Sequence, residues 1–183
     1  MIIANAKYKL TEKFIKQLHY TLKSGTSDSR KDWFNVGEYK KLPNEVGGKE
    51  TAKPEDVATK IKALLKDYNQ KEEHTLEEII DFHYSFETIH PFLDGNGRIG
   101  RLLILLYLME QRLIEKPVIY ISYFLKKNQI EYYDRISEVR RTGNFEQWIR
   151  FFLEAVSKAA SDSLEAIRQL SVLHDTNVEK LPK

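Results

Sequence analysis

Residues 90–101 read HPFLDGNGRIGR and separate two stretches of helical periodicity. Before them, residues 75–78 (TLEE) form a capping box, which predicts the start of a helix. Pro91 predicts that this helix ends at or just before His90. After the turn, residues 98–109 are apolar on nearly every side, which is typical of a central, buried helix. The quoted segment is therefore predicted to connect two core helices.

The second half of this segment favours binding of an anion. Gly95 and Gly97 allow positive φ and a close approach of a ligand, and the helix that follows presents unpaired N–H groups. Arg98 and Arg101 can both project from the first turn of that helix, and two guanidinium groups suit the outer phosphates of a triphosphate. Asp94 lies at the edge of the loop, where its carboxylate could hold Mg²⁺ together with phosphate oxygens.

His90 supplies a base beside this anion-binding loop. An imidazole with an unperturbed pKa of about 6.5 is mostly neutral at pH 7 and can take a proton from a hydroxyl. A base, a metal-binding carboxylate and two arginines next to one anion site indicate phosphoryl or nucleotidyl transfer.

Other interpretations of these residues are weaker. Residues 87–90 have the Glu-x-x-His spacing of di-iron sites in helical bundles, but such sites need a second copy, which the sequence lacks. His83 is predicted to be a packed or solvated helix residue. The basic stretch 135–141 is interrupted by an acidic residue, which favours a solvated helix face over a nucleic-acid contact.

The amino-acid composition excludes several further classes of protein and of site. The 183 residues include 29 Lys and Arg against 27 Asp and Glu, a net charge of +2, which argues against a nucleic-acid partner. The absence of cysteine excludes disulfides, Cys-ligated zinc, iron–sulfur clusters and thiol nucleophiles. The sequence shows neither a secretory signal nor an apolar run long enough to span a bilayer. These features predict a soluble, cytoplasmic protein without membrane contact.

The flanking sequence predicts an all-α bundle of about six helices with one small β-hairpin flap in residues 33–50. The last helix is expected to be amphipathic. Its buried face is expected to consist of Trp148, Phe151, Phe152, Val156, Leu164, Ile167 and Leu170. Residues 24–30 are predicted to be a mobile loop. We expect one domain over residues 1–174, followed at 175–183 by a polar tail or the start of a linker.

The segment 90–101 resembles the signature of the Fic (filamentation induced by cAMP) domain, His-x-Phe-x-Asp/Glu-Gly-Asn-Gly-Arg-x-x-Arg, at every specified position. The resemblance extends to the flap, to residues 122–133 and to residues 148–153, and so covers about residues 10–172. It implies a Fic-type helical bundle and a protein adenylyltransferase (AMPylator). Such an enzyme transfers AMP from ATP to a Ser, Thr or Tyr hydroxyl of a target protein or of itself, releases pyrophosphate, and uses Mg²⁺ or Mn²⁺.

The resemblance also implies roles for single residues. His90 would deprotonate the target hydroxyl, Phe92 would anchor the loop in the core, and Asp94 would bind the metal ion. The phosphate-binding residues would be Gly95, Asn96, Gly97, Arg98 and Arg101, with the arginines on the β and γ phosphates. The flap residues that would clamp the target as an added strand are Leu42, Val46, Gly47 and Gly48. Tyr132 and Tyr133 would line the adenine site, and Arg140 would lie near the ribose or base.

Many Fic proteins carry an inhibitory helix with the pattern Ser/Thr-x-x-x-Glu-Gly/Asn, whose glutamate pairs with the second arginine. No such pattern precedes the motif, and residues 1–5 resemble an interior segment of the family, so we expect an upstream inhibitory region to have been removed. A second candidate is Glu165, which follows Ser161 at the right spacing but departs from the pattern at Ala166. A third possibility is that a separate protein inhibits the enzyme.

Several functional alternatives stay open at this stage. The chain could be a non-catalytic regulatory or toxin–antitoxin-type nucleotide-binding module. Within the enzyme class, it could transfer phosphate or phosphocholine, or remove AMP, and the motif does not distinguish ATP from GTP or CTP. The target protein, the acceptor residue and the oligomeric state, a homodimer being one possibility, are not specified by the sequence.

Overall fold

The computed structural model describes residues 9–31 and 33–179. In this part of the chain it contains seven α-helices, a 3₁₀ turn at Asp28–Arg30 and one antiparallel pair of strands, which confirms the all-α prediction with a small hairpin. The helices are α1 (Glu12–Lys23), α2 (Pro54–Tyr68), α3 (Leu76–Ile89), α4 (Asn96–Glu110), α5 (Ile121–Lys127), α6 (Gln129–Thr142) and α7 (Glu146–Glu179). The strands are β1 (Glu45–Val46) and β2 (Lys49–Glu50).

The capping residues explain where the central helices begin and end. Thr75 and Glu78 form the predicted capping box, with each side chain bonded to the other residue's backbone N–H. Helix α3 ends at Ile89, directly before His90, as Pro91 predicted. Helix α4 begins at Asn96, two residues before the predicted start, because Gly95 adopts a φ of 90° and serves as its N-cap.

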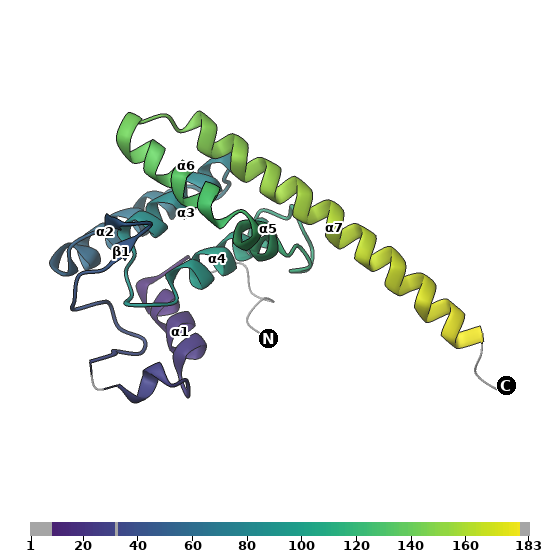
Figure 1. Cartoon of the computed structure of the whole chain (residues 1–183), viewed down its shortest axis with the longest axis horizontal. Helices are drawn as coiled ribbons and strands as arrows, with labels where there is room; N and C mark the ends of the chain where they lie inside the picture. The colour runs from purple at the N-terminus through teal and green to yellow at the C-terminus, as the bar shows by residue number, and fades with distance from the viewer. Residues whose placement is uncertain (1–8, 32, 180–183) are drawn as a thin grey trace.

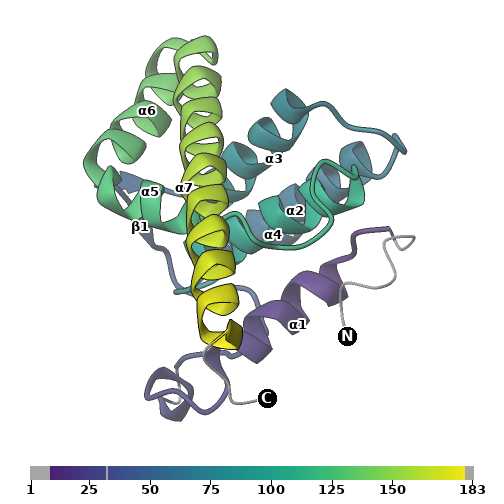
Figure 2. The same ribbon diagram turned by 90° about the vertical axis from the view of Figure 1, so that its right-hand side faces the viewer.

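Helices α3 and α4 form the centre of the bundle, and α2 packs against α3 on one side (Figure 1). Figure 2 shows α7 crossing the front of the bundle, with α5 and α6 on one side and α2, α3 and α4 on the other. The first half of α7 contributes the largest buried side chain, Trp148, together with Phe152 and Ala155. The turn between α3 and α4 is thus fixed by the most buried helices of the molecule.

The second half of α7 extends beyond the bundle (Figure 1). Leu164, Ile167 and Leu170 are about half or more exposed there, so the prediction that they belong to a buried face is wrong. Their helical spacing is correct, but no helix in the described part of the chain covers them. Helix α7 also includes residues 175–179, the first part of the segment expected to be a polar tail or the start of a linker, whereas residues 180–183 lie outside the described part.

Two further expectations concern loops and membranes. Residues 24–30, the predicted mobile loop, contain a 3₁₀ turn, hydrogen bonds within the loop and an ion pair between Asp28 and Lys23. None of the described helices combines the length and apolar character needed to cross a bilayer. The expectation that an upstream inhibitory region has been removed was drawn from residues 1–5, which lie outside the described residues.

Candidate active site

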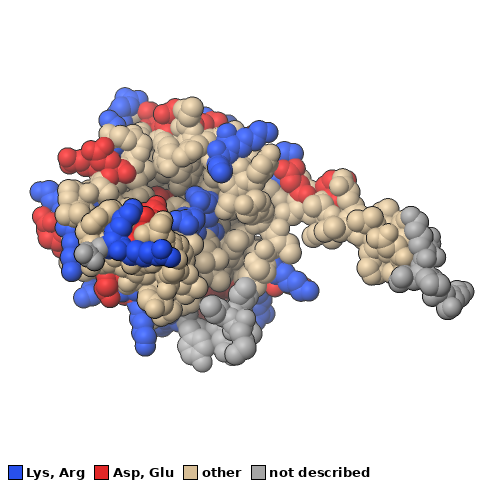
Figure 3. Space-filling model, turned by 60° about the horizontal axis from the view of Figure 1, so that its bottom comes forward, with Lys and Arg blue, Asp and Glu red and all other residues tan. Residues whose placement is uncertain are grey.

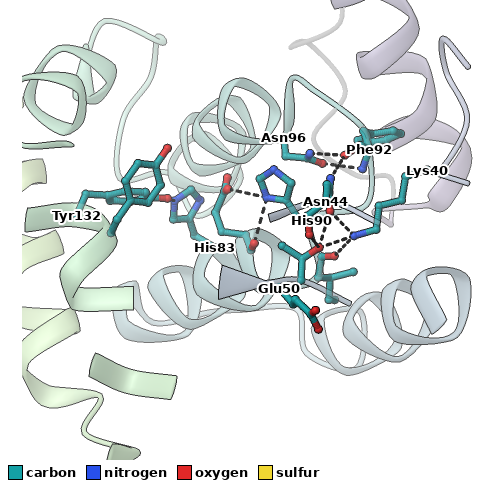
Figure 4. A network of polar contacts seen from close by, with 12 residues as sticks. Lys40, Asn44, Glu50, His83, His90, Phe92, Asn96 and Tyr132 are labelled. Atoms are coloured by element: carbon teal, nitrogen blue, oxygen red, sulfur yellow. Dashed lines mark hydrogen bonds and ion pairs between the residues drawn. The ribbon is translucent and has the colours of Figure 1, made fainter. Parts of the chain in front are cut away.

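The loop between α3 and α4 is closed by the side chain of Asn96 (Figure 4). Its Oδ1 accepts from the backbone N–H of Phe92 at 2.8 Å, and its Nδ2 donates to the Phe92 carbonyl at 2.7 Å. Phe92 is fully buried, as expected of a core anchor. The Asn96 side chain therefore shapes the loop, and the backbone N–H groups at the start of α4 remain the groups available to an anion.

His19 of α1 contacts the same loop through its ring and through a hydrogen bond. Its ring stacks on Phe92 with a centroid distance of 4.0 Å, and its Nε2–H donates to the Asp94 carbonyl at 3.1 Å. Its Nδ1 accepts from the backbone N–H of Gly37. These two bonds require a neutral ring, and burial accordingly lowers the pKa of His19. No local pattern in the sequence indicates a role for His19, because its partners lie far along the chain.

The two arginines leave the first turns of α4 as predicted. Arg98 is exposed, and its Nη2 lies 3.2 Å from Asp94 Oδ2. Arg101 is half-buried, and its Nε donates to Ser122 Oγ at 3.1 Å. Gly97 lies between them, where a Cβ would contact the Arg101 guanidinium at 3.0 Å. The structure thus brings Asp94, Gly97 and both arginines together at one helix N-terminus.

Asp94 is paired with a lysine that sequence reasoning missed. The buried Lys23 Nζ lies 2.5 Å from Asp94 Oδ2 and 2.6 Å from Asp28 Oδ2. Burial opposes ionisation of Asp94, but the bonds from Lys23 and the Gly95 N–H outweigh it, so its pKa is lowered and it is anionic at neutral pH.

The residues around Asp94 fit a cation that relies on substrate oxygens. No group of three or more acidic or histidine side chains suited to a metal ion occurs in the described part of the chain. Mg²⁺ commonly uses one or two carboxylates plus phosphate oxygens, and the partly exposed carboxylate of Asp94 supplies one such ligand. A cation there would have to displace or share the contact with Lys23.

His90 adopts a left-handed conformation, with φ 51° and ψ 63°, at the C-cap of α3. Its Nδ1 lies 3.2 Å from the Glu87 carbonyl and 3.6 Å from Glu87 Oε2. Burial lowers the pKa of His90 to about 4, and the positive charges of Lys40 and Arg140 add to this effect. The ring is therefore neutral at pH 7, the state that a general base requires.

The hairpin flap is bonded directly to the loop (Figure 4). The Lys40 N–H donates to the Pro91 carbonyl, and Asn44 Nδ2 donates to the Phe92 carbonyl, each at 2.8 Å. Lys40 Nζ also binds Asn44 Oδ1 and Thr51 Oγ1, each at 2.6 Å. Burial lowers the pKa of Lys40 to about 8. These contacts place the hairpin beside the turn that holds His90.

The predicted flap residues divide into buried and exposed positions. Val46 is buried and Leu42 is half-exposed. Gly47 and Gly48 both have positive φ and form the turn between β1 and β2, as expected of a two-residue hairpin. A Cβ on Gly47 would lie 3.2 Å from Tyr133 Cβ, so the turn packs closely on α6.

The two tyrosines and the arginine of α6 occupy different environments. Tyr132 is buried, and its hydroxyl lies 3.1 Å from His83 Nε2, whereas Tyr133 is half-buried beside the flap turn. Arg140 Nη1 donates to the Glu50 carbonyl at 3.5 Å. Its other two guanidinium nitrogens, Nε and Nη2, are buried and have no hydrogen-bond partner among the described residues. The structure therefore brings Tyr133 and Arg140 to the flap and turns Tyr132 towards the core.

Glu165 lies apart from these groups. It is exposed on the half of α7 that extends beyond the bundle, and its Oε1 accepts from Gln169 Nε2 at 2.8 Å. Within the described residues it makes no ion pair with Arg101.

Charged side chains of both signs alternate on the face shown in Figure 3. Lys and Arg groups lie beside Asp and Glu groups there and form no continuous basic field. This distribution agrees with the near balance of charge in the sequence.

A helical bundle with a glycine-containing loop between its two central helices, and a β-hairpin bonded to that loop, defines a Fic-type fold. The chain belongs to the Fic/DOC family, whose model matches residues 9–108. The matched range runs from α1 into α4 and includes both the flap and the loop. It ends before Tyr132, Tyr133, Arg140 and Glu165.

Relatives and solved structures agree with this assignment. The chain is 30% identical over 138 residues to the protein adenylyltransferase Fic of Aedes aegypti and 28% identical over 155 residues to that of Drosophila grimshawi. These alignments cover 74% and 83% of this chain but 26% and 30% of those proteins, so the chain spans less than a third of their length. The crystal structure of a Fic family protein from Desulfovibrio desulfuricans matches with a TM-score of 0.72 at 25% identity, over 85% of this chain and 47% of that one.

Proposed function

We propose that this chain is a protein adenylyltransferase that transfers AMP from ATP to a Ser, Thr or Tyr hydroxyl of a target protein. The observation that carries the proposal is the neutral ring of His90 beside an anion-binding helix N-terminus with two arginines. The names of the relatives from Aedes aegypti and Drosophila grimshawi support the same reaction.

In the proposed reaction, the triphosphate lies over the backbone N–H groups of residues 95–97, and Arg98 and Arg101 hold the β and γ phosphates. The target hydroxyl oxygen attacks the α phosphorus and forms the new P–O bond. The bond from the α phosphorus to the bridging oxygen breaks, and pyrophosphate leaves with the bonding electrons. The hydroxyl proton passes to Nε2 of His90.

Asp94 would hold Mg²⁺ or Mn²⁺, which neutralises phosphate charge when bound. The flap would supply backbone groups for an extended segment of the target, a mode of recognition that depends little on target sequence. The nearby bonds from Lys40 and Asn44 to the loop support this role, because they fix the hairpin relative to His90.

The test is adduct formation in a lysate with ATP and Mg²⁺, analysed by mass spectrometry. We expect AMP on hydroxyl side chains of one or more proteins, or of the chain itself, and a loss of at least about 100-fold in rate for His90→Ala. His174→Ala is the matched control, because His174 is exposed near the C-terminal end of α7. ATP binding without any adduct would favour the non-catalytic nucleotide-binding module.

A further inference from the structure

Glu87 is a buried carboxylate on α3, one turn before His90. The residue is 3% exposed, and its Oε1 has no hydrogen-bond partner within the described residues. A buried carboxylate without a partner for one oxygen is costly, so its retention in a core needs a physical reason.

The packing of α4 against α3 leaves space for this carboxylate. Gly100 of α4 faces Glu87, and a Cβ at that position would overlap Glu87 Oε1. The same Cβ would lie 3.0 Å from Cε1 of His83. The absence of a side chain on Gly100 therefore allows α3 and α4 to enclose Glu87 and His83 together.

Glu87 contacts the catalytic ring of the proposed reaction through both its backbone and its side chain. The His90 Nδ1–H donates to the Glu87 carbonyl at 3.2 Å, and Glu87 Oε2 lies 3.6 Å from the same nitrogen. In the neutral ring, a proton on Nδ1 leaves Nε2 with a free lone pair. Glu87 thus lies on the side of His90 opposite to the nitrogen that would accept the target's proton.

The other charged groups around this pair make the protonated ring unfavourable. Burial, Lys40 from the flap segment and Arg140 from α6 all lower the pKa of His90, and the hydrogen bond to the Glu87 carbonyl and the charge of Asp94 only partly oppose them. Around Glu87 the neighbouring titratable groups are Arg101 of α4, His83 of α3 and Tyr132 of α6. Burial raises the pKa of Glu87 to about 7, so its charge can change near neutral pH.

We propose that Glu87 is a positioning residue for His90: it holds the ring with Nδ1 protonated and stabilises the imidazolium that forms when Nε2 takes the hydroxyl proton. This inference rests on the proposed function. A carboxylate beside Nδ1 compensates the new positive charge in a site where water cannot do so. Proton transfer to Nε2 thereby produces a buried ion pair in place of an isolated buried cation.

The kinetic test compares Glu87→Gln, which keeps the size of the side chain and removes its charge, with Glu87→Asp, which keeps the charge. We expect Glu87→Gln to lower kcat by about 10- to 100-fold with little change in KM for ATP, and Glu87→Asp to restore part of the loss. The kcat of the wild type should rise with pH around pH 7, and Glu87→Gln should lack this rise. Glu77→Gln is the control, because Glu77 is exposed on the same helix.

A second measurement does not depend on activity. The ring ¹⁵N resonances of His90 should shift with a midpoint near pH 7 in the wild type as Glu87 ionises, and this shift should be absent in Glu87→Gln. Identical His90 titrations in the two proteins would overturn the proposal, as would an unchanged kcat in Glu87→Gln. If the wild type transfers no AMP while the ¹⁵N shift is present, the proposed function fails and the pairing of Glu87 with His90 stands.

Discussion

Gly100 shows how one residue permits a buried polar pair between two core helices. Its missing side chain leaves room for Glu87 Oε1 and for the ring of His83. Because both groups are buried, we predict that Gly100→Ala lowers the free energy of unfolding by about 1–3 kcal/mol. Urea denaturation followed by far-ultraviolet circular dichroism measures this change.

Gly97→Ala is the matched control for that prediction, because Gly97 lies on the same helix one turn earlier. A Cβ there would meet only the end of the flexible Arg101 side chain. We expect its stability to equal or exceed that of the wild type, since alanine is the better helix former by about 1 kcal/mol. Equal losses of stability in the two variants would contradict the packing described for Gly100.

At the level of elements, the flap depends on the buried Lys40. Its Nζ joins Asn44 and Thr51 at the two ends of the hairpin, and its backbone joins Pro91. We predict that Lys40→Met loosens the hairpin and raises KM for a target protein about tenfold, because ordering a mobile segment opposes binding. The dissociation constant for ATP should stay nearly constant, since the helix N-terminus and both arginines remain in place.

Steady-state kinetics with a purified target and calorimetry with ATP separate these two effects. Lys41→Met serves as the control, because Lys41 is the exposed neighbour of Lys40. A target KM that is the same in all three proteins would show that the hairpin does not need this anchor.

Helix α7 bears the second candidate for an inhibitory glutamate. Glu165 is exposed and bonded to Gln169 on the part of α7 that leaves the bundle. We therefore predict that Glu165→Ala leaves the rate of self-modification within about twofold of the wild type, as expected for a surface substitution. A clear increase in rate would instead identify Glu165 as the inhibitor.

For the whole molecule, the buried histidines determine how stability depends on pH. Burial lowers the pKa of His83 to about 3 and that of His90 to about 4, so their stabilising contribution is present above pH 6.5 and is lost as the pH falls. Glu87 acts in the opposite direction: its raised pKa favours the folded state below pH 4.5, and this contribution is lost as the pH rises through about 7.

Between pH 7 and pH 5, the two histidines take up more protons on unfolding than the one glutamate releases. The unfolded chain therefore binds more protons than the folded one, and stability falls as the pH falls. We predict that the free energy of unfolding falls by an amount on the order of 1 kcal/mol on acidification from pH 7 to pH 5. Glu87→Gln should steepen the fall. Urea titrations at both pH values test this, and a protein that is more stable at pH 5 would refute the assignment of neutral, buried histidines.

Features that depend on residues close together in the sequence could be predicted, and features that depend on residues far apart could not. Thr75 and Pro91 act on neighbouring residues, so the limits of α3 could be read directly. The loop could be predicted because its functional residues are adjacent in sequence. Lys23 and Lys40 reach the loop from other parts of the chain, and no local pattern encodes such contacts. The spacing of Leu164 correctly predicted a helix but could not reveal that the bundle ends before it.

Adenylyl transfer can be tested with ATP labelled on either the α or the γ phosphate. We expect label from α-labelled ATP to enter protein, label from γ-labelled ATP to leave as pyrophosphate, and His90→Ala to abolish both. Protein labelled from γ-labelled ATP alone would contradict adenylyl transfer and would identify the chain as a kinase.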